Sequence, residues 1–406
     1  MILNAVLFGH GSHEAAWRSP NMRATAPLEL SHWVDCARLA ESAGFDGVFL
    51  GDILCLQDRP EQHPSEALDP LMVLAALAGV TDRLRLIGTA STSFNHPIHL
   101  ARRLLTLNHL SGGRAGWNIV TSSYPQEARL FGWPEMPPTK ERYDLAEEVV
   151  SAVQSLWSAW DDSHRTADKA TGQWLDMAPK EVQLEGGFGR IDGSLNLSPA
   201  PYARPLLAQA GSSPTGLRFA TRHADQVFTV QSDINDAKAF RAQVRQGAIE
   251  AGRHPDAVRV LPGLVPFVAE TKQAAEADLA DLTRLIGMAH ILPKLERFTG
   301  LSFADLDPDR PLPYGPNDVS EITFSNSRAH LLVAQAEREG MTLRQFAARF
   351  AAGRGHLLVV GTGRDVAETM QTWVDAGAAD GFNIMPPLLP SGIQTFGTYV
   401  MPHLSR

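Results

Sequence analysis

Short apolar runs alternate with amphipathic stretches along the whole chain. Most of the runs are continuous stretches of Val, Ile, Leu and Phe, as expected for parallel strands that are covered on both faces. Eight of them are predicted strands: residues 2–8, 46–50, 84–89, 115–120, 205–209, 226–230, 258–268 and 382–385. Apolar residues at helical spacing predict helices over 31–42, 70–79, 97–110 and 142–160. Ser31 is the expected N-cap of the first helix, and Pro70 is the expected first-turn residue of the second.

A short motif recurs before three of these strands. In each case a helix ends in a small residue, Asp follows, and the strand begins; the three residues are Asp46, Asp225 and Asp380. The recurrence indicates repeated βα units. Eight such units favour a closed barrel over an open doubly wound sheet, because no GxGxxG turn follows the first strand. The predicted fold class is therefore α/β, a (β/α)8 TIM barrel with insertions.

Two segments interrupt the alternation. Residues 161–204 are rich in Gly, Pro, Ser and Asp, and residues 271–354 combine helical pieces with a proline-rich loop. Insertions of this length in a barrel are usually lids or oligomer contacts, with inert surface elaboration as the alternative. We expect residues 1–406 to form a single barrel domain that carries both insertions.

Composition narrows the class of protein. Hydrophobic residues make up 44% and charged residues 20% of the 406 positions, which is typical of a globular chain with a large core. The formal net charge is −9 and no basic run is longer than Arg102-Arg103, so no nucleic-acid partner is expected. Cys36 and Cys55 are too few for a disulfide framework. The first apolar run breaks at Gly9 and is too short to span a membrane, so we expect no membrane association and a cytoplasmic location.

The C-terminal strand ends, where barrel active sites form, hold mostly hydroxyls and amides. The paired carboxylates of glycoside hydrolysis are missing, since only Asp52 stands clearly at a strand end. His10 and His13 lack an evident third metal ligand, and no GxSxG elbow occurs, so neither a metal nor a serine nucleophile is predicted. A site of this kind suits a polar cofactor that supplies the chemistry itself.

The turn Gly211-Ser212-Ser213-Pro214 is the sharpest local signal. Glycine permits close backbone approach, two hydroxyls lie beside it, and Pro214 fits the first turn of a helix whose dipole favours an anion such as phosphate. A plain serine N-cap is the alternative interpretation.

Longer motifs identify a family. The stretches that carry the resemblance are, in order, Trp17-Arg18-Ser19-Pro20, Phe49-Leu50-Gly51-Asp52, Ser91-Thr92, His96-Pro97, Ala101-Arg102-Arg103, Thr106 to Arg114, Trp117 to Ser122, Glu141-Arg142-Tyr143, Gln209 to Ser213, Val360-Gly361-Thr362 and Asp380 to Asn383. With these stretches the chain resembles the nitrilotriacetate/dibenzothiophene-sulfone/long-chain-alkane monooxygenase family, a branch of the bacterial-luciferase-like superfamily.

The resemblance implies a two-component monooxygenase. A separate NAD(P)H-dependent flavin reductase would supply FMN as FMNH2, which reacts with O2 to a flavin peroxide that oxygenates a small organic substrate, for instance one with sulfur or nitrogen. Such an adduct must be kept away from water. The family further implies a homodimer or homotetramer.

The resemblance also implies roles for cofactor-binding residues. Asp52 would lie near the flavin ring, with a cis peptide between Gly51 and Asp52. Thr92 and Asn118, with Thr121 at the end of the same strand as Asn118, would hydrogen-bond the ring edge or the ribityl chain.

The phosphate would be held by Tyr143, Gly211, Ser212 and Ser213. Thr139 stands where the family commonly has His, which removes a ring donor, although the hydroxyl of Thr139 remains able to donate.

Two histidines are catalytic candidates. His10 ends the first strand, and His290 lies in a predicted helix over 276–290, roughly where an alkane-oxidising relative carries an active-site His. Either one would protonate or orient the reacting groups. For His290, an exposed helix residue is an equally good interpretation.

Two rival functions stay open at this point. One is a hydride-transferring oxidoreductase of the same fold that uses a deazaflavin, since fold does not decide chemistry. The other is a non-catalytic flavin-binding protein.

Overall fold

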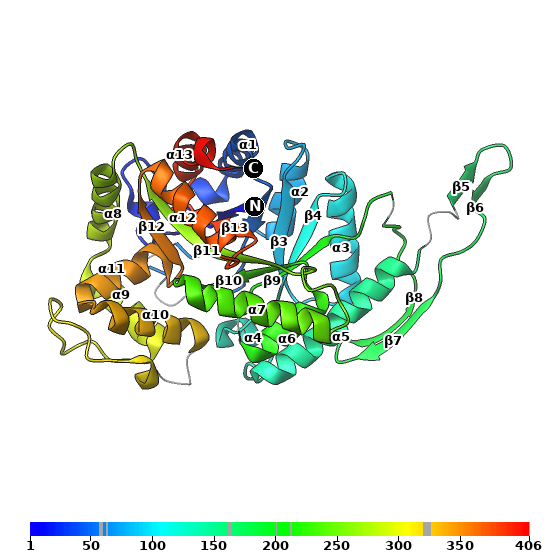
Figure 1. Ribbon diagram of the computed structural model, residues 1–406. Coiled ribbons are helices and arrows are strands. Elements are labelled where there is room, and N and C mark those ends of the chain that lie inside the picture. The colour runs from blue at the N-terminus through cyan, green and yellow to red at the C-terminus, as the bar shows by residue number, and fades with distance from the viewer. Residues whose placement is uncertain are drawn as a thin grey trace.

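Eight parallel strands close into a barrel at the centre of the molecule (Figure 1). The structure is a computed structural model that describes residues 1–56, 60–61, 64–160, 165–199, 201–211, 213–319 and 326–405. The barrel closes because β13 pairs with β1 and β11 pairs with both β10 and β13. Its strands, in chain order, are β1 (Ile2–Leu7), β2 (Gly47–Leu50), β3 (Arg85–Ser91), β4 (Ala115–Val120), β9 (Leu206–Gln209), β10 (Gln226–Thr229), β11 (Arg259–Val268) and β13 (Gly381–Ile384). All eight predicted strands and the predicted fold class are confirmed.

A ninth parallel strand, β12 (Leu357–Gly361), was not predicted. β11 is ten residues long. Its first half pairs with β10 and β13, and its second half extends beyond them to pair with β12 from Leu264 to Val268. The length of β11 therefore creates the edge on which β12 forms.

Helices surround the barrel between successive strands (Figure 1). The four predicted helices are confirmed as α1 (Leu30–Ala43), α2 (Pro70–Ala78), α3 (Pro97–Leu110) and α5 (Thr139–Ser158). Pro70 starts α2 as expected, with Asp69 as the N-cap. The expectation for Ser31 is wrong, because Glu29 occupies the N-cap and Ser31 lies inside the first turn. The others are α4 (Pro125–Leu130), α6 (Pro214–His223), α7 (Ile234–Glu250), α12 (Gly363–Asp375) and α13 (Ser391–Tyr399), apart from those of the second insertion.

The recurring Asp residues hold the N-terminal ends of neighbouring strands together. The carboxylate of Asp46 accepts a hydrogen bond from the Leu3 amide at 2.7 Å. Asp225 accepts from the Leu207 amide at 2.8 Å, and Asp380 accepts from the Val260 amide at 2.9 Å. Because each Asp introduces one strand and bonds to the barrel strand that comes before it in the chain, the motif fixes strand register at the end away from the mouth.

Two hydrophobic layers support the barrel. Apolar side chains such as Phe49, Ile87 and Val265 fill its interior, and a larger cluster that includes Trp117 packs the strands against the surrounding helices. Burial on both faces explains why the strands read as continuous apolar runs.

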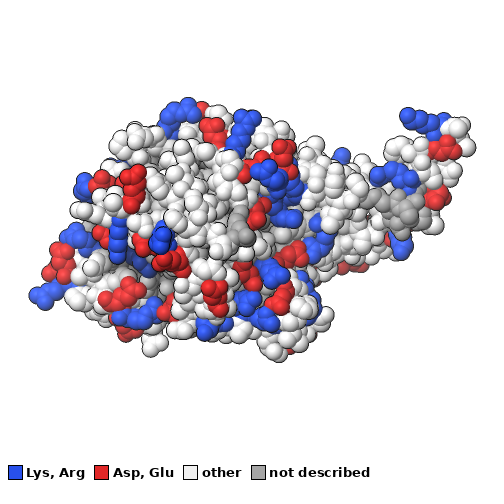
Figure 2. All heavy atoms as spheres, turned by 45° about the horizontal axis from the view of Figure 1, so that its top comes forward, with Lys and Arg blue, Asp and Glu red and all other residues white. Residues whose placement is uncertain are grey.

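The segment 161–204 contains two hairpins, β5–β6 and β7–β8. Their strands are β5 (Arg165–Asp168), β6 (Gln173–Leu175), β7 (Val182–Gly186) and β8 (Gly189–Gly193). In Figure 1 they form an arm that projects from the body of the molecule. Trp174 near the tip is 65% exposed. On the face shown in Figure 2, acidic and basic side chains are interspersed on both the body and the arm.

The segment 271–354 builds a helical unit with a core of its own. It holds α8 (Lys272–Ile286), α9 (Met288–Thr299), α10 (Asn326–Glu339) and α11 (Leu343–Gly353). Leu295, Phe303 and Phe346 are fully buried in this core, which also takes in Ala15 from the loop after β1. The predicted helix over 276–290 is wrong, because Gly287 at φ 71° separates α8 from α9. We call α8–α11 the helical insertion.

Among the described residues, no helix is both long and apolar enough to cross a membrane.

Candidate functional site

A cradle of neutral groups forms where β9 turns into α6. Gln209 at the end of β9 donates from Nε2 to the phenol oxygen of Tyr143 at 3.1 Å and accepts from the Gly211 amide at 2.9 Å. Ser213 is the N-cap of α6, and its Oγ accepts from the Gly216 amide at 3.1 Å. We call Tyr143, Gln209, Gly211, Ser213 and Gly216 the cradle.

The two cradle glycines leave room that a side chain would fill. A Cβ on Gly211 would lie 2.4 Å from Gln209 Nε2 and 2.6 Å from the Tyr143 hydroxyl. A Cβ on Gly216 would lie 2.8 Å from the same hydroxyl and 3.2 Å from Ser213 Oγ. The phenol of Tyr143 and the hydroxyl of Ser213 therefore approach one backbone turn from two sides.

The hydrogen-bond directions in the cradle leave its hydroxyl protons available. Both oxygens accept from protein groups, so each O–H can donate to a further acceptor. Burial raises the pKa of Tyr143, which keeps its phenol protonated. The Thr215 amide, in the first turn of α6, has no acceptor within its own helix.

The structure refines the prediction for the phosphate turn in two respects. The amide of Gly211 is occupied by Gln209, so it does not face outward as a bare donor. Ser213 is an N-cap, as the plain interpretation held, yet capping uses only its lone pair. Ser212 lies outside the described residues.

Arg142, next to Tyr143 on α5, connects the cradle side to the end of β4. Its guanidinium donates to Thr121 Oγ1 at 3.2 Å and to Thr139 Oγ1 at 3.0 Å, and it also bonds the carbonyl of Ser122. Thr139 is exposed at the first turn of α5. Arg142 and Gln209 belong to motifs that were recognised in the sequence, but no role was predicted for them. Their positions beside Tyr143 and Gly211 in the chain could have indicated a role at the same site.

Asn118 and Thr92 lie deeper, on β4 and just after β3. Asn118 Nδ2 donates to Thr89 Oγ1 at 2.8 Å, and that hydroxyl donates to the Leu50 carbonyl at 2.8 Å. Asn118 Oδ1 is buried with no hydrogen-bond partner among the described residues. The Thr92 hydroxyl donates to the Val120 carbonyl at 3.2 Å. A buried acceptor without a donor is rare in folded proteins, so Asn118 Oδ1 is an acceptor that a bound ligand could satisfy.

Asp52 follows β2 and is partly buried. Burial raises the pKa of its carboxyl to about 6, and the negative charges of Asp69 and Glu127 add to the shift. The expected cis peptide between Gly51 and Asp52 is wrong: in the described part of the chain the cis bond is Leu389–Pro390. Phe8 packs so closely on Gly51 that a Cβ there would lie 2.5 Å from its ring.

The two predicted catalytic histidines differ in their surroundings. His10 is buried, its Nε2 lies 2.8 Å from the Ala24 carbonyl, and burial lowers the pKa of its ring. His290 is exposed in the first turn of α9. The structure therefore leaves His10 at a strand end and places His290 on the outside of the helical insertion.

A charged connection between the β1 loop and the helical insertion escaped the sequence reasoning. The Glu14 carboxylate, whose side chain is 6% exposed, pairs with Lys294 of α9 and with Arg354, whose Nε donates at 2.7 Å. These two cations lower the pKa of Glu14 to about 2 despite its burial. The residues lie hundreds of positions apart in the chain, so no local motif announces the contact.

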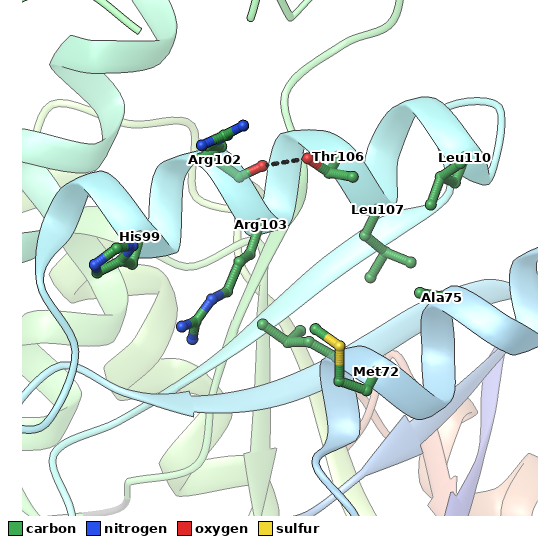
Figure 3. Close-up of a pocket in the computed structure, with 9 residues that line it drawn as sticks. Met72, Ala75, His99, Arg102, Arg103, Thr106, Leu107 and Leu110 are labelled. Atoms are coloured by element: carbon green, nitrogen blue, oxygen red, sulfur yellow. Dashed lines mark hydrogen bonds between the residues drawn. The ribbon is translucent and has the colours of Figure 1, made fainter. Parts of the chain in front are cut away.

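A groove lies away from the strand ends, on the outside of the barrel (Figure 3). It runs between α2 and α3, and Thr106 Oγ1 donates to the Arg102 carbonyl beside it. We assign it no catalytic role, because none of the polar strand-end residues lines it. Within the described residues, no three His, Cys, Asp or Glu side chains gather in a way that could hold a metal ion.

Known proteins resemble this chain over its full length. The family described as luciferase-like monooxygenase matches residues 12–380. N-acetyl-S-(2-succino)cysteine monooxygenase of Bacillus subtilis is 37% identical over all of this chain and 92% of its own. Component A of the nitrilotriacetate monooxygenase of Aminobacter aminovorans is 35% identical over 98% of this chain and 90% of its own. The crystal structure of DmoA from Hyphomicrobium sulfonivorans superimposes with a TM-score of 0.86 at 28% identity, covering 99% of this chain and 87% of that one.

Proposed function

Because the chain belongs to the luciferase-like monooxygenase family, we propose that it is the oxygenating component of a two-component, FMNH2-dependent monooxygenase. A separate NAD(P)H-dependent reductase would deliver the reduced flavin. The substrate would be a small organic molecule. The relatives named for N-acetyl-S-(2-succino)cysteine and nitrilotriacetate support one that contains sulfur or nitrogen.

The cradle is the observation that carries the proposal. A phosphate group needs several donors converging on one point, and the protons of Tyr143 and Ser213 supply two beside the dipole of α6. The glycines at 211 and 216 let the backbone approach, since a side chain at either position would collide with the phenol oxygen. Arg142, next to Tyr143 on α5, adds a cation between the cradle and the end of β4.

The remaining polar residues suit the other end of a flavin. Asn118 Oδ1 would accept a hydrogen bond from the ring edge or from a ribityl hydroxyl, which satisfies an acceptor that has no partner among the described residues. Thr92 lies just after β3, which pairs with β4, and Asp52 lies just after β2, the next strand in the barrel. Residues at four strand ends would thus hold one elongated cofactor.

Bound reduced flavin supplies the electrons that activate O2, and the protein's part is to hold the flavin and exclude water. We propose that the helical insertion is the cover. Its contacts with the β1 loop, through Glu14 and through Arg18 to the Leu285 carbonyl, hold it beside the mouth. His10, at the base of that loop, is our candidate for proton delivery. Oligomerisation as a homodimer or homotetramer remains a proposal from the family resemblance.

Incorporation of labelled oxygen into a product tests the proposal. Purified protein, with a generic NADH:FMN reductase, NADH, FMN and a panel of small thioethers and tertiary amines, is expected to place one atom of 18O2 in a product. Omitting the reductase should abolish product formation. Turnover with NADPH alone would contradict the two-component scheme.

The same assay separates the rival functions. Product formation that needs a deazaflavin in place of FMN would point to hydride transfer. Tight flavin binding with no turnover across the panel would point to a flavin-binding protein.

A further inference from the structure

Several cationic side chains gather where the helical insertion meets the loop after β4. Three guanidiniums, those of Arg297, Arg328 and Arg354, act electrostatically on the phenol of Tyr124, which follows β4. Arg328 and Arg354 also act on His356, at the start of β12. We call Arg297, Arg328 and Arg354 the arginine group.

The arginine group lies above the barrel interior. The His356 ring packs on Phe228 of β10 with ring centroids 5.4 Å apart, and Phe228 packs edge-on against Phe49 of β2 at 5.3 Å. This approach is possible because Gly263 has no side chain; a Cβ there would lie 2.2 Å from His356 Nδ1.

Gly355 packs on Leu332 of α10, four residues after Arg328, and on Val230 just past β10; a Cβ on Gly355 would lie 3.7 Å from each side chain. Because residues four apart share a helix face, Arg328 lies on the side of α10 that faces the C-terminal end of β10, one of the strand ends that form the barrel mouth.

Arg328 is the member for which the described residues provide no counterion. Glu14 pairs with Arg354 and Lys294, and Arg297 has a contact of its own. In the part of the chain that the structure describes, Arg328 makes no ion pair and no hydrogen bond, and its electrostatic neighbours are Arg354, which repels it, and Tyr124. Its pKa is lowered by burial, although its side chain keeps some accessible surface.

A cation that is partly withdrawn from water and has no anionic partner is costly, so such residues generally face a ligand or a functional site. The titratable groups that interact with Arg328 are Arg354, Tyr124 and His356. Burial and the two nearby arginines hold the pKa of His356 well below its usual range, and its Nδ1 has no partner among the described residues. Glu127 also faces Tyr124, but its carboxylate is already bonded to the amides of Leu54 and Tyr124. One negatively charged group beside Arg328 would compensate the charge of its guanidinium.

We infer that the substrate carries an acidic group, a carboxylate or a sulfonate, and that Arg328 binds this group beneath the helical insertion. The inference rests on the proposed function, whose substrate class it specifies. A guanidinium holds either anion through two parallel N–H donors, which also fixes the orientation of the substrate in the mouth. The neutral cradle would then bind the phosphate of the flavin, and the charged arginine group would bind the acidic group of the substrate.

Equilibrium binding tests this with three matched probes that share a thioether chain: 3-(methylthio)propionate, 3-(methylthio)propanesulfonate and 3-(methylthio)propionamide. Nitrilotriacetate and its triamide form a second matched set. Calorimetric titration of the full chain should show that at least one acid binds about tenfold or more tightly than its amide. The two acidic thioethers distinguish carboxylate from sulfonate as the preferred group.

Substitution identifies the residue. Arg328→Gln should weaken binding of the preferred acid about tenfold or more and leave amide binding unchanged. Arg328→Lys, which keeps the charge, should give an intermediate affinity, and Arg102→Gln on the exposed face of α3 is the matched control. Reduced-FMN affinity, measured by fluorescence, should be unchanged in all three variants, which also verifies their fold.

Three results would overturn the inference: equal binding of acids and amides, unchanged acid binding in Arg328→Gln, or no binding of any acid. Failure of the proposed function is distinguishable from these. In that case the acids still bind through Arg328, while no oxygenated product forms with reductase, FMN and O2.

Discussion

The cradle and the arginine group face the same barrel mouth but are built on opposite electrostatic principles. In the cradle the principal donors are neutral, and each is already fixed by a partner, as Tyr143 is by Gln209. In the arginine group, the donors are cations, and Arg328 has no carboxylate partner among the described residues. A site whose donors are held in place before binding is preorganised for one constant ligand, whereas an uncompensated charge selects a ligand by its sign.

The two regions also differ in how they are anchored. The cradle belongs to the barrel, with Gln209 on β9 and Tyr143 on a helix that packs against the strands. The arginine group belongs to an insertion with a separate core, joined to the barrel mouth in part through Glu14. We therefore expect that a substitution can disrupt one region while the other keeps its function.

The largest effect should come from Glu14→Gln, which breaks that joint. Removing the carboxylate leaves Lys294 and Arg354 without their anion, and we expect a loss of about 3 kcal/mol in the free energy of unfolding, toward the lower end for a buried pair because Arg354 is 49% exposed. Urea unfolding measures it.

The effect of Glu14→Gln should also depend on pH. The pKa of Glu14 is about 2 in the folded protein, below its usual value of 4.5, so its contribution is fully present above about pH 4.5 and is lost as the pH falls toward 2. Flavin affinity should be preserved at neutral pH; a matching loss of flavin binding would show that the two regions are not independent.

Gly211→Ala should break the cradle alone. The new Cβ would need space held by the Tyr143 hydroxyl and Gln209 Nε2, so one of them must move. We expect reduced-FMN affinity to fall about 30- to 100-fold, in line with the loss of one or two charge-assisted hydrogen bonds. Gly79→Ala, where the nearest atom would be 3.7 Å away, is the control. Weaker binding of acidic probes as well would argue against separate sites.

Tyr143→Phe should sharpen the comparison with a smaller change. It removes one proton donor and leaves Gln209 Nε2 without its acceptor. Reduced-FMN affinity should fall about tenfold, and the affinity for reduced riboflavin, which lacks the phosphate, should be unchanged. Tyr202→Phe serves as the control. Equal losses for both flavins would assign Tyr143 a structural role.

Asp52→Asn should give the smallest effect. It changes the one carboxyl group among the residues proposed to bind the flavin. Because the pKa of Asp52 is raised to about 6 in the folded protein, its ionisation opposes folding above pH 6 and not below about pH 4. The variant should be more stable by about 1 kcal/mol at pH 8, less than the full shift because the carboxyl keeps contact with solvent. Thermal unfolding from pH 4.5 to 8 shows this, with the exposed Asp305→Asn as control; a gain independent of pH would refute it.

Sequence alone predicts the barrel well because its strands are buried on both faces and read as continuous apolar runs. β12 was not predicted, although residues 357–360 are a short continuous apolar run; its place in the sheet depends on the second half of β11, which extends beyond β10 and β13. Ser31 was mistaken for an N-cap because capping depends on where the preceding loop places Glu29.

The site divides in the same way. Tyr143, Gly211 and Ser213 sit in local motifs and were predicted, and the structure brings them together. Arg328 and Glu14 carry no motif, and only the packing of the insertion on the β1 loop gives them neighbours. Charge balance at such a position is visible in three dimensions and not along the chain.

Anaerobic titration of the protein with reduced FMN and with reduced riboflavin tests the central claim most directly. If the cradle binds the phosphate, reduced FMN should bind at least about 100-fold more tightly than reduced riboflavin, and Gly211→Ala should remove most of that difference. Equal affinities for the two flavins in the unmodified protein would contradict the account.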